Sequence, residues 1–201
     1  MELSEVIKRR RSVRKFKNIE ISPDIINDLL ESASLAPETD VNSYYFGVIN
    51  DNNIKNKLAK ATLWAEWIAE APVIFVCCVD ISFDIGDQSD DNYGVVGNKL
   101  RYNDEIVNYL REHKDRKVCK TLLHSTPVYI AAQHIILTAG SHNLRGCLVD
   151  YMDIEKINKI LDLPDHITCQ VLVPIGYSDE TPKKKGKYNK KERVFYNKWV
   201  K

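Results

Sequence analysis

A run of basic residues near the N-terminus is the stretch of the sequence whose residue types most clearly suggest chemistry. Arg9, Arg10, Arg11 and Arg14 lie close together, with Ser12 among them. Like charges at this spacing repel one another unless an anion neutralises them, and guanidinium groups bind phosphate oxygens through paired hydrogen bonds. In an extended backbone Ser12 and Arg14 share one face, so only part of the run can reach one ligand. The run predicts a phosphate site, with a solvated basic arm or a nucleic-acid patch as alternatives.

The positive charge of the chain is concentrated at its two ends. Residues 1–17 carry seven Lys or Arg against two Glu, and residues 179–201 carry nine against three acidic residues. Because the net charge of the whole chain is only +1, the body between these ends carries −10. A nucleic-acid binder more often spreads positive charge along one groove, whereas two basic ends can also converge on one compact anion. Charge alone does not choose between these partners.

The composition is typical of a single soluble domain. A chain of 201 residues with 44% hydrophobic content can bury a substantial core, and this length suits one domain, residues 1–201. No targeting leader is recognisable, and the longest apolar run, Ala71–Val79, is too short to span a bilayer. The cysteines are odd in number and form no C-x-x-C pair, which is typical of reduced thiols: Cys77, Cys78, Cys119, Cys147 and Cys169. We expect a cytoplasmic protein without disulfides or a membrane anchor.

Several common catalytic and cofactor motifs are absent from the sequence. It has no G-x-G-x-x-G, no Walker loop and no G-x-S-x-G, so any bound anion would have to be held by side chains. The five histidines lack metal-ligand spacing, which predicts no metal site, and His134 is expected to be a core residue. No pair of carboxylates stands out as a general acid and base. This pattern is typical of a protein whose cofactor supplies the chemistry.

Apolar periodicity and capping residues predict the elements that would position the basic run. Ser22 and Pro23 mark the start of a helix that ends near Ala36, and Asp51 or Asn52 starts another. Continuous or alternating β-rich apolar stretches predict strands. We expect helices at residues 2–9, 23–36, 52–60, 63–68, 104–113, 127–139 and 154–161, and strands at 44–49, 72–79, 144–149 and 168–176.

Three features of this pattern bear on packing and assembly. Trp64 and Trp67 are spaced as on the buried face of a helix, so we expect both in the core rather than in a stacking platform. Residues 81–98 lack periodicity and are expected to form a long surface loop, with a mobile lid as the alternative. The helix expected to begin at Pro127 is apolar almost all round, which predicts burial against a second subunit and hence a dimer.

The basic run and the short helix before it resemble the N-terminal segment of the FMN-dependent nitroreductase family. In that family an Arg-x-Ser-x-Arg or Arg-x-Ser-x-Lys pattern holds the flavin phosphate. Here the pattern is Arg10, Ser12 and Arg14, with Arg11 between them. The resemblance therefore implies that these four residues anchor the phosphate of FMN.

The loop after the second expected helix gives a second, partial match. Relatives have a proline loop that leads to Asn-x-Gln-Pro-Trp-x-Phe. Here Pro37 and Asn42 match, while Tyr44, Tyr45 and Phe46 replace the Gln, Pro and Trp. In relatives this loop reaches the flavin of the other subunit. The resemblance thus implies that Pro37 and Asn42 contact the cofactor and that Tyr44 and Phe46 lie beside the substrate.

The turn after the long helix gives a third match. Relatives often read Gly-Leu-Gly-Thr-Cys-Trp here, and the segment Asn143–Leu148 keeps the Leu and the Cys but has lost both glycines from their usual places. The family uses this backbone to meet the flavin ring near N5 and its carbonyl edge, which implicates Gly146, Cys147 and Leu148 in cofactor binding. We expect Cys147 to be a packing residue rather than a nucleophile.

The C-terminal segment gives the fourth match. Relatives place a Lys or Arg of a basic cluster on the flavin phosphate, and spacing from Glu192 favours Lys187, with Lys185 second. Aromatic residues follow this cluster, which predicts that the tail, residues 179–201, docks on the body or on the partner subunit. The two basic ends of the chain would then share one phosphate.

The resemblance implies an α+β fold of three layers, with a central, mostly antiparallel sheet flanked by helices, in a homodimer with FMN at the interface. It implies an FMN oxidoreductase that uses NADH or NADPH to reduce nitroaromatic, quinone or similar small-molecule acceptors by a ping-pong mechanism, without nucleic acid or membrane. Dehalogenation, ene reduction and flavin destruction on the same fold are alternatives that Tyr44 and Tyr45 leave open. A non-catalytic flavin binder or a nucleic-acid protein is the alternative outside enzymes.

Overall fold

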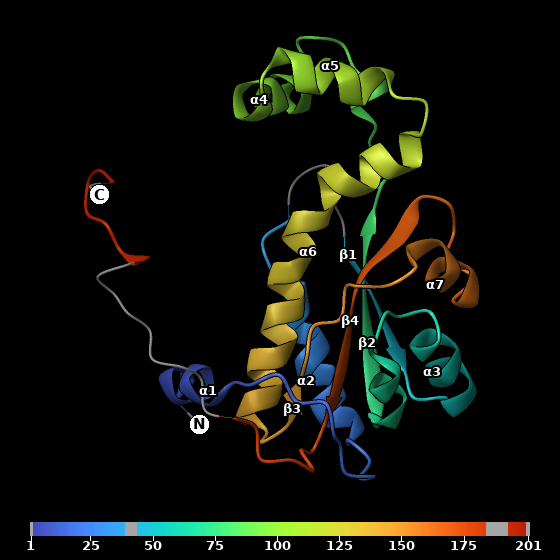
Figure 1. The fold of residues 1–201 in the computed structure, drawn as a ribbon, viewed down its shortest axis with the longest axis vertical. Helices are drawn as coiled ribbons and strands as arrows, with labels where there is room; N and C mark the ends of the chain where they lie inside the picture. The colour runs from blue at the N-terminus through green and yellow to red at the C-terminus, as the bar shows by residue number, and fades with distance from the viewer. Residues whose placement is uncertain (1, 39–43, 184–192, 200–201) are drawn as a thin grey trace.

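The computed structural model describes residues 2–38, 44–183 and 193–199, and it confirms the expected α+β architecture. In this part of the chain a four-stranded antiparallel sheet, in the order β1-β2-β4-β3, forms the central layer, with helices on both faces (Figure 1). The strands are β1 Tyr44–Ile49, β2 Val73–Asp80, β3 Arg145–Gly146 and β4 Ile167–Gly176. The helices are α1 Leu3–Arg9, α2 Pro23–Ser34, α3 Asn52–Ala59, η1 Glu66–Glu70, η2 Ile85–Asp87, α4 Tyr93–Tyr102, α5 Asp104–Glu112, α6 Arg116–Ser141 and α7 Ile154–Ile160.

The two central strands are buried on both faces, as their unbroken apolar sequences predict. β2 and β4 pair antiparallel from Val73 opposite Ile175 to Asp80 opposite Ile167, with a bulge at Cys77/Cys78. α2 and α6 cover one face through a cluster that includes Phe75. α3, α7 and η1 cover the other face. The result is a helix, sheet and helix sandwich with one apolar cluster on each side of the sheet.

Side-chain caps explain where most of the predicted helices begin. Ser22 Oγ accepts a hydrogen bond from the backbone N–H of Ile25 at 3.4 Å, and the Asp51 carboxylate accepts one from Ile54 at 2.8 Å. Asp153 does the same for Lys156 at 3.0 Å. Each cap satisfies a backbone donor that has no partner inside the helix. These starts were readable from sequence because the capping residue types are few.

The long helix begins earlier than the sequence predicts. We expected it to begin at Pro127, but α6 begins at Arg116, with Asp115 as its cap, and Pro127 lies inside it. A proline inside a helix lacks the N–H for one helical hydrogen bond and usually bends the axis. Figure 1 shows such a change of direction in the first half of α6. The physical reason for the error is that proline is favoured at a helix start but is tolerated at a bend.

The expectation of a loop over residues 81–98 is wrong for its second half. This stretch contains η2 and the start of α4, and α4 and α5 form a pair that lies beyond the end of the sheet (Figure 1). We call residues 85–112 the α4–α5 unit. It has its own apolar cluster, in which Ile85, Val95 and Val107 are buried. Periodicity did not reveal this helix because only one residue of α4, Val95, is buried.

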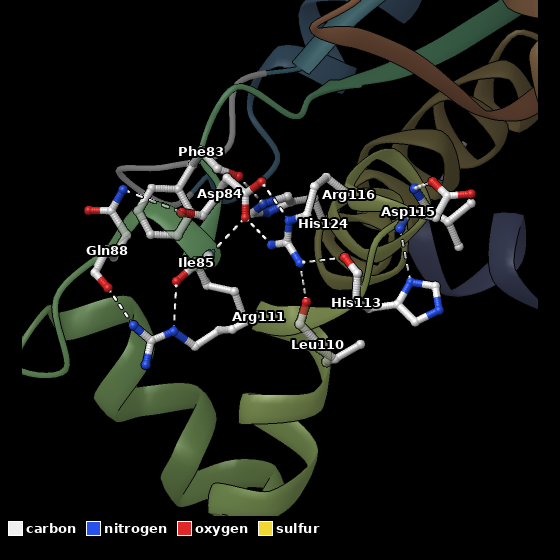
Figure 2. Close-up of polar contacts among 12 residues, drawn as sticks. Phe83, Asp84, Ile85, Gln88, Leu110, Arg111, His113, Asp115, Arg116 and His124 are labelled. Atoms are coloured by element: carbon white, nitrogen blue, oxygen red, sulfur yellow. Dashed lines mark hydrogen bonds and ion pairs between the residues drawn. The ribbon is translucent and has the colours of Figure 1, made fainter.

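Arg116 attaches the α4–α5 unit to the start of α6, and Arg111 ties α5 to η2 within the unit, as Figure 2 shows. Arg116 forms an ion pair with Asp84 and donates to the Leu110 carbonyl. Arg111 donates through Nε to the Ile85 carbonyl at 3.1 Å and through Nη2 to the Gln88 carbonyl at 2.6 Å. Burial works against ionisation of Asp84, but the hydrogen bonds from Arg116 and from the backbone outweigh it and lower the pKa of this carboxyl. The unit is thus held by charge-assisted bonds.

The two tryptophans predicted in the core have different environments. Trp67 is half-buried and packs against Phe16, with ring centroids 6.3 Å apart. Trp64 is 87% exposed and has a positive φ of 58°, so its expected place in the core is wrong. The chain is not a regular helix at Trp64, since η1 begins only at Glu66. The helical spacing that suggested a shared buried face therefore does not apply.

The C-terminal segment that the structure describes lies apart from the sheet (Figure 1). Its large apolar side chains are exposed, with Tyr196 at 84% and Trp199 at 65%. Phe195 and Trp199 contact each other with ring centroids 5.4 Å apart. None of the helices in the described ranges combines the length and the hydropathy that crossing a membrane requires.

We predict that the fold loses stability as the pH falls below about 6.5, in part because of His124. This side chain is buried, donates from Nε2 to the Phe83 carbonyl at 3.1 Å, and has its pKa lowered chiefly by burial. The unfolded chain therefore binds a proton at a higher pH than the folded chain, so stability is fully present above the unfolded pKa and is lost below it. Urea unfolding at pH 7.5, 6.5 and 5.5 measures this slope. His124→Gln should flatten it and His166→Gln, at an exposed position, should not; equal slopes in all three proteins would contradict the prediction.

We predict that Gly146→Ala destabilises the fold by about 1–3 kcal/mol, the range for inserting a carbon into a packed site. A Cβ at this position would overlap the Ile175 side chain and lie 2.7 Å from the Pro174 carbonyl oxygen, so the pairing of β3 with β4 would have to open. The matched control is Gly97→Ala in α4, where no atom lies within 4 Å of the added carbon. That change should stabilise by about 0.5–1 kcal/mol. Urea unfolding checks both, and a neutral Gly146→Ala would show that the close packing at this site is not rigid.

Candidate functional site

The basic N-terminal run lies along the edge of the sheet, beside β3 and the end of β4 (Figure 1). Ser12 forms a parallel bridge with Gly146, and the N–H of Val13 donates to the Gly146 carbonyl at 3.3 Å. Further along, the N–H of Lys17 donates to the Tyr177 carbonyl at 2.8 Å. The backbone of the run is thereby fixed, while its charged side chains project from it.

The start of the basic tail meets this run. The N–H of Asp179 donates to the Lys15 carbonyl at 3.0 Å, and the N–H of Arg14 donates to Glu180 Oε1 at 2.6 Å. Residues far apart in sequence are therefore adjacent in space. The remaining candidates of this tail, Lys185 and Lys187, lie outside the described residues, as does Asn42 of the proline loop.

A cationic cavity of about 550 Å³ opens between the run and the residues after β4. Arg11 does not point freely into it, because its Nη1 donates to the carbonyls of Lys8 at 2.8 Å and Arg10 at 2.6 Å. Arg145 is half-buried, and burial followed by the nearby charge of Arg9 lowers the pKa of its guanidinium. A group whose charge is disfavoured in this way gains from a bound anion. The lining residues are Lys8, Arg9, Arg11, Lys17, Asn143, Arg145, Tyr177, Ser178, Glu180, Thr181 and Pro182.

A much smaller cavity adjoins the end of α1. Arg10 lines it together with Arg9, Arg11, Arg145 and Gly146. Three basic side chains of the run and one of β3 therefore surround the same corner of the molecule. Arg145 was not among the predicted site residues. The signal in the sequence was present, since an arginine occupies one of the places where the resemblance calls for glycine.

A second site cavity, of about 190 Å³, lies beside Cys147 and Leu148. We call it the aromatic cavity, because Trp64, Trp67 and Tyr151 line it. Arg14 belongs to this cavity, with its guanidinium carbon 5.9 Å from the centre of the Trp67 ring. The paired stretch around Ser12 and Gly146 thus contributes lining residues to both cavities. Arg11 and Arg145 line the cationic cavity, and Arg14 and Cys147 line the aromatic cavity. The full lining is Arg14, Leu63, Trp64, Ala65, Trp67, Cys147, Leu148, Val149, Asp150 and Tyr151.

The side chains around the aromatic cavity offer little catalytic chemistry of their own. Cys147 is buried, and its thiol donates to the Leu148 carbonyl at 3.4 Å. Asp150 accepts a hydrogen bond from the Tyr129 hydroxyl at 3.3 Å, and burial followed by the charge of Asp150 raises the pKa of Tyr129 to about 12. Within the described residues no group of three or more His, Cys, Asp or Glu could hold a metal ion. The geometry suits binding of a redox group rather than side-chain catalysis.

The described residues at the two ends of the proline loop, Pro37 and Tyr44, line neither cavity. Tyr44 pairs with Val79 at the opposite end of β2 from Val73, whereas Gly146 pairs with Ile175, the partner of Val73. The Tyr44 hydroxyl donates to the Pro37 carbonyl at 2.6 Å, and the Tyr44 ring lies 6.4 Å from that of Phe46. Burial followed by the charge of Glu38 raises the pKa of Tyr44. These residues form a second cluster, away from the basic run.

Comparisons with known proteins agree with this architecture. The sequence profile named "Nitroreductase family" matches residues 7–177. A relative from Thermus thermophilus, named NADH dehydrogenase, is 24% identical over 174 residues, covering 86% of this chain and 84% of that protein. An FMN-dependent nitroreductase from Clostridium difficile superimposes with a TM-score of 0.66 at 22% identity, covering 96% and 98% of the two chains. NADPH:FMN oxidoreductase from Vibrio harveyi, solved with NAD⁺, gives a TM-score of 0.72 at 19% identity, covering 99% and 78%.

The matched residues include everything that forms the two cavities up to Tyr177. They include the basic run from Arg9 onward, all four strands and both layers of helices. The likeness of the solved structures at low sequence identity indicates that the same sheet and helix arrangement has been retained. On the strength of the profile match over most of its length, this chain belongs to the nitroreductase family.

Proposed function

We propose that this protein is an NAD(P)H-dependent oxidoreductase that uses FMN as its cofactor. The observation that carries the proposal is two cavities, one cationic and one aromatic, that are both lined by residues of the paired stretch of backbone around Ser12 and Gly146. FMN has a phosphate at one end and a planar ring at the other, and these two environments complement it. Membership of the nitroreductase family supports the same conclusion.

The basic side chains fit the phosphate end of FMN. Arg10, Arg11 and Arg145 surround one corner of the molecule, and burial followed by the charge of Arg9 lowers the pKa of Arg145. Ser12 supplies a hydroxyl on the same run. We assign these residues, with Arg14 at the border of the aromatic cavity, to phosphate and ribityl binding. Lys187, or Lys185, would complete the site from the C-terminal tail.

The backbone after β3 fits the ring end. Cys147 and Leu148 line the aromatic cavity, and Gly146 precedes them at the small cavity beside α1, so this backbone would lie against the flavin ring. Rigid backbone pairing to β4 orients this wall. When bound, FMN supplies the redox chemistry, by accepting hydride from NADH or NADPH and then reducing a nitroaromatic, quinone or similar acceptor in a ping-pong sequence. The chain itself binds, orients and shields these groups.

A second copy of the chain would complete the site. Pro37, Tyr44 and Phe46 are carried on the far end of the sheet, so they reach the ring only if they come from the partner, and Asn42 would accompany them. α6 has exposed apolar side chains available for an interface, with Leu122 64% exposed. The exposed aromatic residues of the tail suit docking on the partner as well. We therefore propose a homodimer in which the acceptor binds beside Tyr44 and Phe46 of one protomer.

We predict that the purified protein shows flavin absorption bands, and that anaerobic NADH or NADPH bleaches them. Reduction of a bound flavin removes its visible absorption, so the spectrum reports turnover of the first half-reaction directly. Chemical reduction with dithionite is the control that shows the flavin to be reducible. Bands that dithionite bleaches but neither nicotinamide does would indicate a flavin binder without this activity. The rate with each nicotinamide would identify the preferred donor.

We predict that replacing Arg10 and Arg145 together with Ala weakens FMN binding by at least about a hundredfold. Each charge-assisted hydrogen bond contributes roughly 1.5–3 kcal/mol, and two of them multiply their effects on Kd. Riboflavin, which lacks the phosphate, should bind the double variant nearly as well as the wild type. The matched control, Lys57→Ala with Lys159→Ala, removes two exposed cations from α3 and α7. Equal losses for FMN and riboflavin in fluorescence titrations would contradict a phosphate role.

A further inference from the structure

Trp64 combines two properties that are each unfavourable for a tryptophan. Its backbone has a φ of 58°, in the left-handed region that is a genuine outlier for a bulky side chain. Its side chain is also 87% exposed, although an indole is among the most favourable groups to bury. Strained backbone is retained mainly where the surrounding structure enforces it, and such positions cluster at binding sites.

Backbone pairing of the residues just before Trp64 fixes the position of its backbone. The N–H of Leu63 donates to the Tyr151 carbonyl at 2.8 Å, Thr62 forms an antiparallel bridge with Met152, and the N–H of Asp153 donates to the Ala61 carbonyl at 2.8 Å. The segment before Trp64 is therefore tied to the segment after β3. These two segments are the opposite walls of the aromatic cavity.

The large exposed side chains around this cavity converge on it. Leu63 is 49% exposed, Trp64 87% and Tyr151 73%, and all three line the same hollow of about 190 Å³. Trp67, three residues further on, is the tryptophan that packs against the core, where its ring contacts Phe16. Packing of the core therefore does not account for Trp64. An apolar surface that lines a concavity is the usual form of a ligand site.

The chemistry of the walls selects a planar ring as the occupant. The walls are aromatic and aliphatic, and Arg14 already lies over the face of Trp67, at 5.9 Å from its centre. The cavity is smaller than a typical pocket for a whole ligand, so it suits one ring system whose remainder lies elsewhere. The cationic cavity that adjoins the same backbone stretch is the place for an attached phosphate.

We propose that Trp64 is a positioning residue that stacks its indole against the isoalloxazine ring of the flavin. This inference rests on the proposed function, and it adds a role for a side chain that the resemblance did not indicate. The left-handed backbone at Trp64 then holds the indole in its binding position before the flavin arrives, so little ordering is needed on binding.

The test compares Trp64→Ala with Trp64→Phe, using FMN and riboflavin as probes. Stacking acts on the ring, which both probes share, so Trp64→Ala should weaken the binding of both by about tenfold. Trp64→Phe keeps an aromatic face and should retain affinity within about threefold. Tyr93→Ala is the matched control, because Tyr93 is 92% exposed at the start of α4 and lines none of the cavities described above. Kd values come from flavin fluorescence titrations.

A spectroscopic readout separates stacking from a merely structural role. An indole in contact with a flavin quenches its fluorescence, so the flavin bound to the wild type should be dark and the flavin bound to Trp64→Ala markedly brighter. Trp64→Gly removes the indole and relieves the backbone, so its melting temperature should equal or exceed that of the wild type. Loss of ring affinity in that stable variant cannot be attributed to unfolding.

The possible failures of this test are distinguishable. If Trp64→Ala and Tyr93→Ala bind riboflavin equally well while the wild type binds FMN, the stacking proposal is overturned and the flavoprotein proposal stands. If the wild type binds neither probe, both are overturned. If Trp64→Ala changes the oligomeric state in sedimentation experiments without changing the Kd for riboflavin, the exposed indole is a contact between subunits, and the stacking proposal is again wrong.

Discussion

The candidate site depends on one backbone interaction, the pairing of the basic N-terminal run with β3 and the end of β4. This pairing brings Arg10 and Arg11 beside Arg145, although more than a hundred residues separate them in sequence. Several guanidinium groups then share a small volume, and a bound anion would relieve their mutual repulsion. The same pairing places Arg14 and Cys147 at the aromatic cavity. A single stretch of extended chain therefore sets the distance between an anion site and a ring site.

Much of the fold could be predicted from sequence because its signals are local. β2 and β4 are continuous apolar segments, and the caps at Ser22 and Asp51 lie at the expected positions. The errors arose where one residue type has two structural uses. Pro127 is compatible with a helix start or a bend, and Trp64 fits a buried helical face only if the backbone there is helical.

The candidate site was only partly predictable, since it is assembled by contacts between distant segments. The high charge density of the basic run predicted an anion site. Nothing in the local sequence indicated that Arg145 and Lys17 would line the same cavity. Arg14 was grouped with the phosphate ligands by its place in a motif, whereas its side chain lies over Trp67. Trp67 packs against Phe16 and so lies beside Arg14, and this contact between distant segments leaves no signal in the local sequence.

The α4–α5 unit has a consequence for how the molecule moves. Its apolar cluster, centred on Ile85, Val95 and Val107, is separate from the two clusters that sandwich the sheet. A region with its own small core, attached to α6 through Arg116 and the packing of Leu123, can open as one cooperative piece, at a lower free energy than global unfolding. Amide hydrogens in residues 85–112 would then exchange together and earlier than those of β2 and β4. The α4–α5 unit would thus unfold locally while the central sheet and the helices that cover it stay folded.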